Sequence, residues 1–162
     1  MADASQPPQE QVRTAIGEPG ACVEYSIDPE KALVLVRMAS KISARDIENY
    51  AKALRTDPLF VPAFSEIVDL RAVEEVEITP AEAIALADRV DPFAPSSRRA
   101  FVAINDYQAN SARMHQMLRS PAKSIAIFTT MEAAERWIRS ADPKSAPGST
   151  GRVLPFAPRS RP

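Results

Sequence analysis

Few side chains in this sequence belong to the types that usually perform catalysis or bind metal ions. The chain contains one histidine, His115, and one cysteine, Cys22. A structural zinc site usually needs several such ligands, so these two residues cannot form one, although a carboxylate-only magnesium site stays open. His115 lies off the main apolar stripe of its predicted helix and is interpreted as a surface residue rather than a catalytic base. Cys22 is interpreted as a small apolar residue near an edge strand, not as a nucleophile.

The glycines stand where they cannot form a phosphate-binding loop. Gly17, Gly20, Gly148 and Gly151 are the four glycines of the chain, and all lie outside residues 21–138. Walker and dinucleotide-binding loops need glycines where the backbone approaches the ligand. The sequence therefore excludes those loops, and we expect no cofactor and no metal ion.

Polar side chains near the predicted carboxyl ends of strands are the remaining candidates. Ligands of open parallel sheets bind beyond this edge of the sheet. The sequence therefore predicts a binding rim for a ligand or partner, which comprises Ser40, Asp69, Arg71, Asn105, Asp106 and Thr129. Helix caps and turns explain the same residues equally well. None of them places a nucleophile beside a base, so no catalytic residue and no enzymatic activity are predicted.

Alternating strand and helix segments must position these residues. Residues 23–27 alternate between apolar and polar side chains, as a half-exposed edge strand does, and residues 32–38 resemble a strand buried on both faces. These two strands should form a hairpin. Three later buried strands, 64–70, 100–104 and 125–128, are separated by single helices, which implies parallel neighbours. The predicted fold class is α/β, with an open, mostly parallel sheet of about five strands, an N-terminal β-hairpin and four helices.

Capping residues mark the predicted helix starts. Ser43 with Asp46, and Thr79 with Glu82, have the spacing of capping boxes. Asn105 or Asp106 should cap the third helix, and Thr129 with Glu132 the fourth. Apolar stripes at helical spacing should face the core. They comprise Ile47, Tyr50, Ala51 and Leu54; Ala83, Leu86, Ala87 and Val90; Tyr107, Ser111, Met114, Met117 and Leu118; and Ala133, Ala134, Trp137 and Ile138.

Composition sets the domain borders. The 162 residues suit one domain, and the net charge of −1 gives no general attraction to nucleic acid. Residues 1–20 and the basic residues 139–162 are rich in proline and polar side chains, so we expect two disordered tails around a domain at 21–138. The basic tail is interpreted as solvated, with an anionic partner as the alternative. Short apolar runs and the absence of a secretory signal predict a cytoplasmic protein without a membrane segment.

Residues 22–138 resemble the SpoIIAA-like branch of the STAS superfamily, which is related in fold to bacterial anti-sigma-factor antagonists and has been compared with the lipid-binding Sec14 group. The order and spacing of several short motifs carry the resemblance. They are the β-β-α opening, Asp57-Pro58 with Phe60 and Pro62, Val68-Asp69-Leu70-Arg71, Ala112-Arg113-Met114, and Phe128 followed by Glu132-Ala133 and Trp137-Ile138. The resemblance implies a non-catalytic binding or regulatory domain.

The resemblance also singles out Thr79. Regulatory antagonists carry an Asp-Ser-Ser-Gly-like motif at the start of the second helix, where a partner kinase phosphorylates a serine. The matching stretch here is Glu77-Ile78-Thr79-Pro80, which lacks both serines and the glycine. Thr79 falls near the phosphoacceptor position and is a candidate for that role, with a plain helix cap as the alternative.

Three functions stay open. The first is a STAS-like module that binds a protein partner, a homodimer included. The second is a domain that binds a lipid or another apolar small molecule, with Phe101, Tyr107, Met114 and Met117 as candidate lining; core packing of the two methionines is the alternative. The third, an enzyme using rim carboxylates, has no supporting motif.

Overall fold

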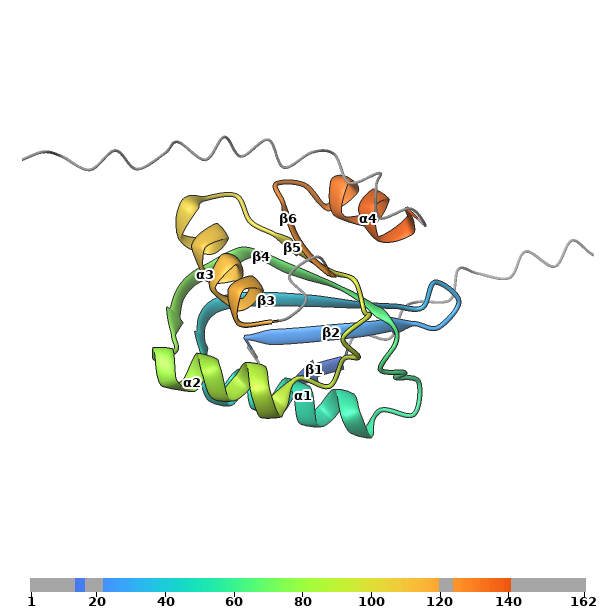
Figure 1. Ribbon diagram of the computed structural model, residues 1–162, viewed down its shortest axis with the longest axis horizontal. Helices are drawn as coiled ribbons and strands as arrows, with labels where there is room; N and C mark the ends of the chain where they lie inside the picture. Colours follow the sequence, from blue (N-terminus) through green and yellow to red (C-terminus); the bar gives the residue numbers. More distant parts are fainter. Residues whose placement is uncertain (1–13, 17–21, 120–123, 141–162) are drawn as a thin grey trace, which may run out of the picture.

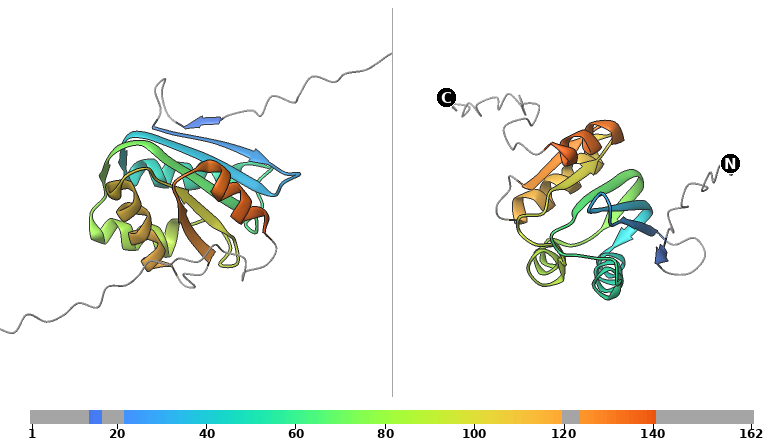
Figure 2. Two further views of the ribbon diagram at one scale, coloured as in Figure 1. Left: turned by 90° about the horizontal axis from the view of Figure 1, so that it is seen from above. Right: turned by 90° about the vertical axis from the view of Figure 1, so that its right-hand side faces the viewer.

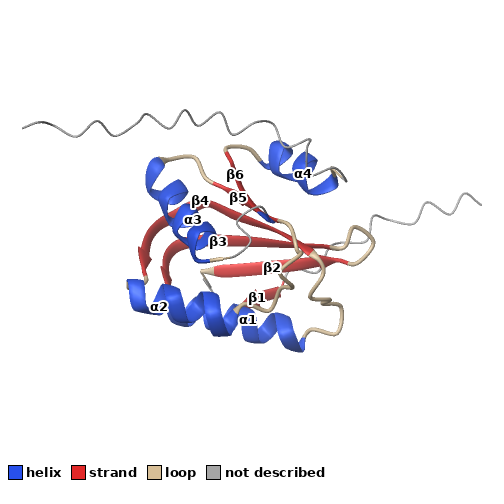
Figure 3. Ribbon diagram, viewed as in Figure 1, coloured by secondary structure: helices blue, strands red, loops and turns tan. Residues whose placement is uncertain are grey.

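The sheet at the centre of the molecule has its strands in the order of the sequence. A computed structural model describes residues 14–16, 22–119 and 124–140, in which the strand order is β1-β2-β3-β4-β5-β6 (Figures 1 and 3). The strands are β1 (Thr14–Ile16), β2 (Val23–Asp28), β3 (Leu33–Ser43), β4 (Ser65–Glu77), β5 (Arg99–Val102) and β6 (Ile125–Phe128). The helices are α1 (Ala44–Thr56), α2 (Pro80–Ala85) with the π-helical turn η1 (Leu86–Val90), α3 (Asp106–Leu118) and α4 (Met131–Arg139).

Strand pairing confirms the predicted α/β fold class. β2 and β3 form the expected antiparallel hairpin. β3, β4, β5 and β6 are parallel neighbours in chain order, each joined to the next by one helical segment. A helical crossover between parallel strands returns the chain to the adjacent position, so the predicted alternation of strands and helices was sufficient for this topology.

The sheet has one strand more than the sequence predicted. β1 pairs antiparallel with β2 through three residues of the segment that was assigned to the N-terminal tail. Such a short strand carries too little alternation to be recognised from sequence. At the other border, Arg139 of the expected tail 139–162 is the last residue of α4 and Ser140 is its C-cap. Residues 1–13, 17–20 and 141–162 lie outside the described residues, so the predicted disorder stays a prediction.

β3 and β4 extend well beyond their predicted ends. Asp69 was expected to end its strand, yet β4 continues to Glu77, and only the pairing with β5 stops there, where Asp69 lies opposite Val102. The continuation of β3 and β4 is bulged and curves toward α1 and α2 (Figure 1). Within it Ser40 has a φ of 57°, a left-handed conformation that is uncommon for a residue with a Cβ atom. The predicted rim is therefore not a single edge of the sheet.

Helix starts follow the sequence closely. Both capping boxes are present, Ser43 with Asp46 and Thr79 with Glu82. Asn105, one of the two candidates, caps α3 by accepting a hydrogen bond from the Gln108 backbone N–H. The expected cap of α4 was wrong by one residue, because the hydroxyl that accepts from the Ala133 backbone N–H belongs to Thr130 and not to Thr129.

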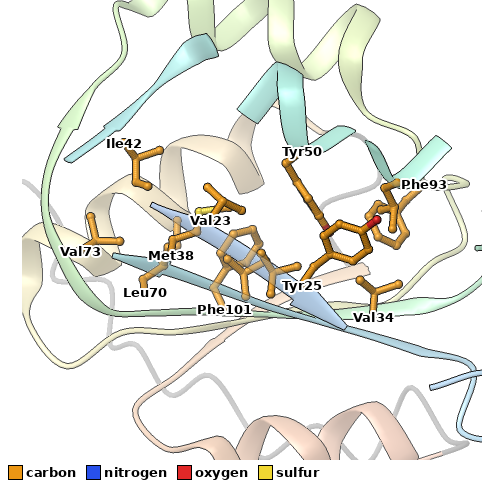
Figure 4. Packing of buried hydrophobic residues seen from close by; sticks show 14 of the residues in the cluster. Val23, Tyr25, Val34, Met38, Ile42, Tyr50, Leu70, Val73, Phe93 and Phe101 are labelled. Carbon is orange, nitrogen blue, oxygen red and sulfur yellow. The ribbon is translucent and has the colours of Figure 1, made fainter. Parts of the chain in front are cut away.

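Two hydrophobic clusters lie on opposite faces of the sheet. On one face, Tyr50 and Leu54 of α1 and Ala112 of α3 belong to the cluster with Val68 and Phe101 (Figure 4). On the other face, α4 is the only described helix that packs against the sheet, and its Ala134 and Trp137 cluster with Ile67, Ala100 and Val102. The end-on view shows α1 and α2 side by side beneath the sheet and α4 above it (Figure 2). Burial of Trp137, at 7% exposure, confirms the predicted stripe of the last helix.

The predicted stripe of α3 was wrong. Tyr107 and Met114 are 47% and 45% exposed, Met117 is 81% exposed, and the buried residues of the helix are Gln108 and Ala112. The Gln108 amide accepts from the Ile104 backbone N–H and donates to the backbone carbonyls of Arg71 and Val73. These bonds tie the helix to β4 beyond the end of its pairing with β5, and the apolar stripe of the helix lies away from the core.

Candidate functional site: an apolar groove with a charged floor

A groove opens between the sheet and the helices α1, α2–η1 and α3. Its volume is about 380 Å³, within the range of about 300–1,000 Å³ that ligand pockets occupy. The lining is mostly apolar and comes from strands and helices alike. It includes Ile42 and Leu70 of the sheet, Ile47 of α1, Ala83 and Val90 of α2–η1, and Leu118 of α3.

Of the four residues predicted to line an apolar ligand site, three lie along this groove. Phe101, Tyr107 and Met114 border the groove. Phe101 lies in the core beneath it, whereas Tyr107 and Met114 are half-exposed along α3. The Tyr107 hydroxyl is held in place because it accepts a 2.7 Å hydrogen bond from the Val76 backbone N–H. Met117 is not among the lining residues.

The floor of the groove contains a buried ion pair. Glu66 of β4 is fully buried and faces Arg99, its direct neighbour on β5. The Arg99 Nε donates to Glu66 Oε2 at 2.5 Å, and the Tyr50 hydroxyl donates to the other carboxylate oxygen at 2.8 Å. Burial, followed by the adjacent Glu66 carboxylate, raises the pKa of Tyr50 well above its ordinary value, so the phenol is neutral.

A second carboxylate and a second guanidinium extend this pair toward α3. Asp91 follows η1, and its Oδ2 accepts from Arg99 Nη1 at 2.6 Å and from Arg119 Nη1 at 2.5 Å. The Arg99 guanidinium also lies over the Phe93 ring, 4.9 Å from its centroid. We call Glu66, Asp91, Arg99 and Arg119 the charged cluster. It holds two positive and two negative charges, so it is neutral as a whole.

His115 lies against the charged cluster, so its interpretation as a surface residue was wrong. Its Nε2 lies 3.1 Å from Arg99 Nη1, and its ring packs 5.5 Å from the Phe101 ring. Burial, and next the charges of Arg99 and Arg119, lowers the pKa of His115 to about 3. The imidazole is therefore neutral at physiological pH. His115 belongs to the lining of the groove.

Two residues of the predicted polar rim form a pair in the structure. Asp69 and Arg71 are joined by three hydrogen bonds of 3.0, 2.9 and 2.8 Å, and both line a hollow of about 700 Å³ that also borders Leu35 and Met131. Burial alone would raise the pKa of Asp69, but the hydrogen bonds and charge of Arg71 bring it below its ordinary value. The Asp69 carboxylate is thus ionised, and its charge is already balanced by Arg71.

The other predicted residues line neither the groove nor the hollow. Ser40, Asp106 and Thr129 are exposed, and Asn105 is engaged as a cap. Thr79 is exposed at the start of α2, where its hydroxyl takes part in the capping box. Within residues 14–16, 22–119 and 124–140, no group of three or more histidine, cysteine, aspartate or glutamate side chains could hold a metal ion.

Sequence reasoning missed all four members of the charged cluster. One signal was present, because Glu66 interrupts a strand that was predicted to be buried on both faces, and a buried carboxylate needs a cationic partner. Asp91 was singled out only as a helix stop before Pro92. Nothing in the local sequence identifies Arg99 or Arg119 as its partners.

Comparison with known proteins supports the fold. The structure is similar to the crystal structure of an uncharacterised protein of the DUF3478 family with a SpoIIAA-like fold from Shewanella loihica PV-4, with a TM-score of 0.51 and 12% sequence identity over 83% of this chain and 99% of that one. No protein-family model and no curated protein matches the sequence. The chain therefore has a SpoIIAA-like fold, as the sequence resemblance implied. In the described part of the chain, every helix is too short or too polar to cross a membrane.

Proposed function

We propose that this domain is a non-catalytic binding protein that takes up an apolar small molecule in the groove between α1, α2–η1 and α3. The apolar lining of the groove is the observation that carries the proposal. Half-exposed apolar side chains continue it to the surface, namely Tyr107, Met114 and Leu118. Exposed apolar side chains around a hollow are typical of ligand-binding sites, because a ligand would remove them from water.

The chemistry of the floor supports binding rather than catalysis. A general base works best when its pKa lies near the working pH, but His115 has a pKa of about 3. Tyr50 is held in its neutral form, and its hydroxyl donates a hydrogen bond to Glu66. The carboxylates of the charged cluster already accept hydrogen bonds from guanidinium groups. The floor therefore provides a neutral, preorganised surface and offers no activated nucleophile.

Pyrene, a fluorescent hydrocarbon, tests this proposal because it can bind only through apolar contact. We expect saturable binding to the full chain, detected by the polarity-sensitive emission of pyrene. Ala83→Phe places a ring in the lining and should weaken binding at least tenfold. Ala85→Phe is the matched control, because Ala85 lies in the same helix, is exposed and does not line the groove. Equal pyrene affinity of both folded variants, or no binding to the wild type, would refute the proposal.

A protein partner is the second candidate, favoured by exposed apolar side chains that do not line the groove. Met117 is 81% exposed and Leu59 is 53% exposed. Met117→Glu should remove such a partner from the material that co-purifies with the chain, as identified by mass spectrometry. The same variant should leave pyrene binding unchanged, so the two functions can be separated.

A further inference from the structure

The hydrogen bond between Arg99 and His115 determines which imidazole nitrogen carries the proton. A guanidinium group can only donate hydrogen bonds. Arg99 Nη1 lies 3.1 Å from His115 Nε2, so Nε2 must be the acceptor and must be unprotonated. Since the neutral imidazole keeps one proton, that proton is on Nδ1.

The Nδ1–H group of His115 is an unused donor. Among the described residues, no hydrogen-bond partner of Nδ1 is found, while the side chain lines the groove. A donor that stays unpaired when a ligand excludes water costs free energy, so a ligand that supplies an acceptor there binds better than a pure hydrocarbon.

The surrounding charges restrict what this acceptor can be. Arg99 and Arg119 face His115, and the carboxylates of Glu66 and Asp91 already balance them. A ligand carboxylate would add an uncompensated negative charge to an apolar groove, which is costly. A ligand ammonium group cannot accept from Nδ1–H and would likewise add an uncompensated charge to the apolar groove. A neutral oxygen acceptor satisfies the donor and keeps the charges balanced.

We infer that the groove selects apolar molecules that carry a neutral carbonyl or ester oxygen, which accepts a hydrogen bond from Nδ1 of His115. This inference rests on the proposed function, because it requires that the groove binds an apolar ligand. It adds the chemical class of the polar end of that ligand and the residue that recognises it.

Because His115 is the only histidine of the chain, its tautomer can be measured directly. Long-range proton–nitrogen correlation spectra of the uniformly labelled protein at pH 7 should show a protonated Nδ1 and an unprotonated Nε2. Addition of methyl octanoate should shift the Nδ1 resonance and slow the solvent exchange of its proton, whereas octane should not slow this exchange. A protonated Nε2 in the free protein would overturn the inference, whatever the ligand does.

Competition against pyrene provides the second measurement. Methyl octanoate should bind roughly tenfold more tightly than octane, as expected for one hydrogen bond to a neutral donor that the ligand removes from water, and octanoate should bind no better than the ester. His115→Phe should abolish the preference for the ester. His115→Gln should restore part of it, because its amide oxygen can accept from Arg99 while its amide nitrogen donates to the ligand.

The outcomes separate this inference from the proposed function. Equal affinities of the wild type for octane and methyl octanoate, or tightest binding of octanoate, would overturn the inference and leave the apolar site in place. Binding of none of these compounds would overturn both. Thermal unfolding checks that the variants are folded, and if His115→Phe does not fold, His115→Gln and the tautomer measurement still decide.

Discussion

Arg99 is the residue on which the floor of the groove depends. Its guanidinium binds Glu66 from the neighbouring strand, Asp91 from the end of η1, and His115 from α3. A buried charge is costly unless its partners are fixed in good geometry. Here the register of β4 and β5 places Glu66 directly beside Arg99, so the pair is built into the sheet. The same guanidinium sets the orientation of the His115 ring.

Protonation of His115 should make the stability of the domain depend on pH. The pKa of His115 is about 3 in the folded protein, whereas an unfolded histidine has its ordinary value near 6.5. Between these values the unfolded chain binds a proton that the native state excludes. His115 therefore does not change the free energy of unfolding with pH above about pH 6.5. As the pH falls below that value, the free energy of unfolding decreases by up to about 1.4 kcal/mol per pH unit.

Urea unfolding of the wild type and of His115→Gln at pH 7 and pH 4.5 measures this contribution. We expect the wild type to lose more stability than the variant between the two pH values, because glutamine does not titrate. Other groups titrate equally in both proteins and cancel in the comparison. The same pH dependence in both would show that His115 is solvated and not held against Arg99.

At the scale of elements, local sequence places the ends of helices, and contacts with the sheet decide which face of a helix is buried. The capping boxes at Ser43 and Thr79 form as the local spacing predicted. The buried face of α3, in contrast, follows the hydrogen bonds of Gln108 with β4. As a result Met114 faces the groove and Met117 faces solvent. Both methionines had been predicted to pack in the core, with the lining of a ligand site as the alternative.

The cap of α2 carries a prediction about regulation. The Thr79 hydroxyl accepts from the Glu82 backbone N–H, and Glu82 accepts in return from the Thr79 backbone N–H. Thr79→Ala should therefore destabilise the domain by about 1 kcal/mol in denaturant unfolding. Thr79→Ser should be nearly silent, and Thr79→Asp should be tolerated because aspartate caps helices well.

Phosphopeptide mapping of protein from its native host tests the competing role of Thr79. We expect no phosphate there, because the hydroxyl is engaged in the capping box and Pro80 stiffens the chain after it. Substantial phosphorylation would instead support the antagonist-type switch that the family resemblance implied.

The docking of α4 depends on one aromatic side chain. Trp137 is buried against the sheet, its ring lies 5.7 Å from the Phe128 ring, and Arg98 lies over it. Trp137→Ala should destabilise the domain by about 3 kcal/mol or more, which is typical of a buried large aromatic residue. Met117→Ala, a substitution at a mostly exposed apolar position, is the control and should change the free energy of unfolding by less than about 0.5 kcal/mol. A loss below about 1 kcal/mol at Trp137 would mean that α4 is not anchored there.

At the scale of the whole molecule, the sheet has a packed hydrophobic cluster on one face and the groove on the other. Among the described helices, only α4 covers β4, β5 and β6 on one face, where it forms a hydrophobic cluster with them. On the other face, α1 and α3 contact the sheet, and α2–η1 contacts both of these helices at the groove, with the charged cluster beneath them. The groove therefore lies where three separate chain segments meet.

Limited proteolysis tests the extent of the folded unit. We expect cleavage first within residues 1–20 and 139–162, leaving a resistant core that contains 21–138, because composition changes sharply at both borders. The pairing of β1 with β2 predicts that residues 14–16 are cut later than residues 1–13. Early cleavage between residues 60 and 120, before the ends are removed, would contradict a single folded unit.

The sequence by itself determined the features that depend on neighbours along the chain. Alternation and β-branched runs located β2 to β6, single-helix connections implied their parallel order, and caps such as Thr79 located helix starts within a residue. The tertiary structure alone decided the groove, the neutral charged cluster and the state of His115. These depend on Glu66, Arg99 and His115, which lie on three different elements and meet only when the sheet register and the α3 orientation are set. No local sequence pattern predicts these contacts, because the free energy that stabilises them comes from interactions between separate segments of the chain.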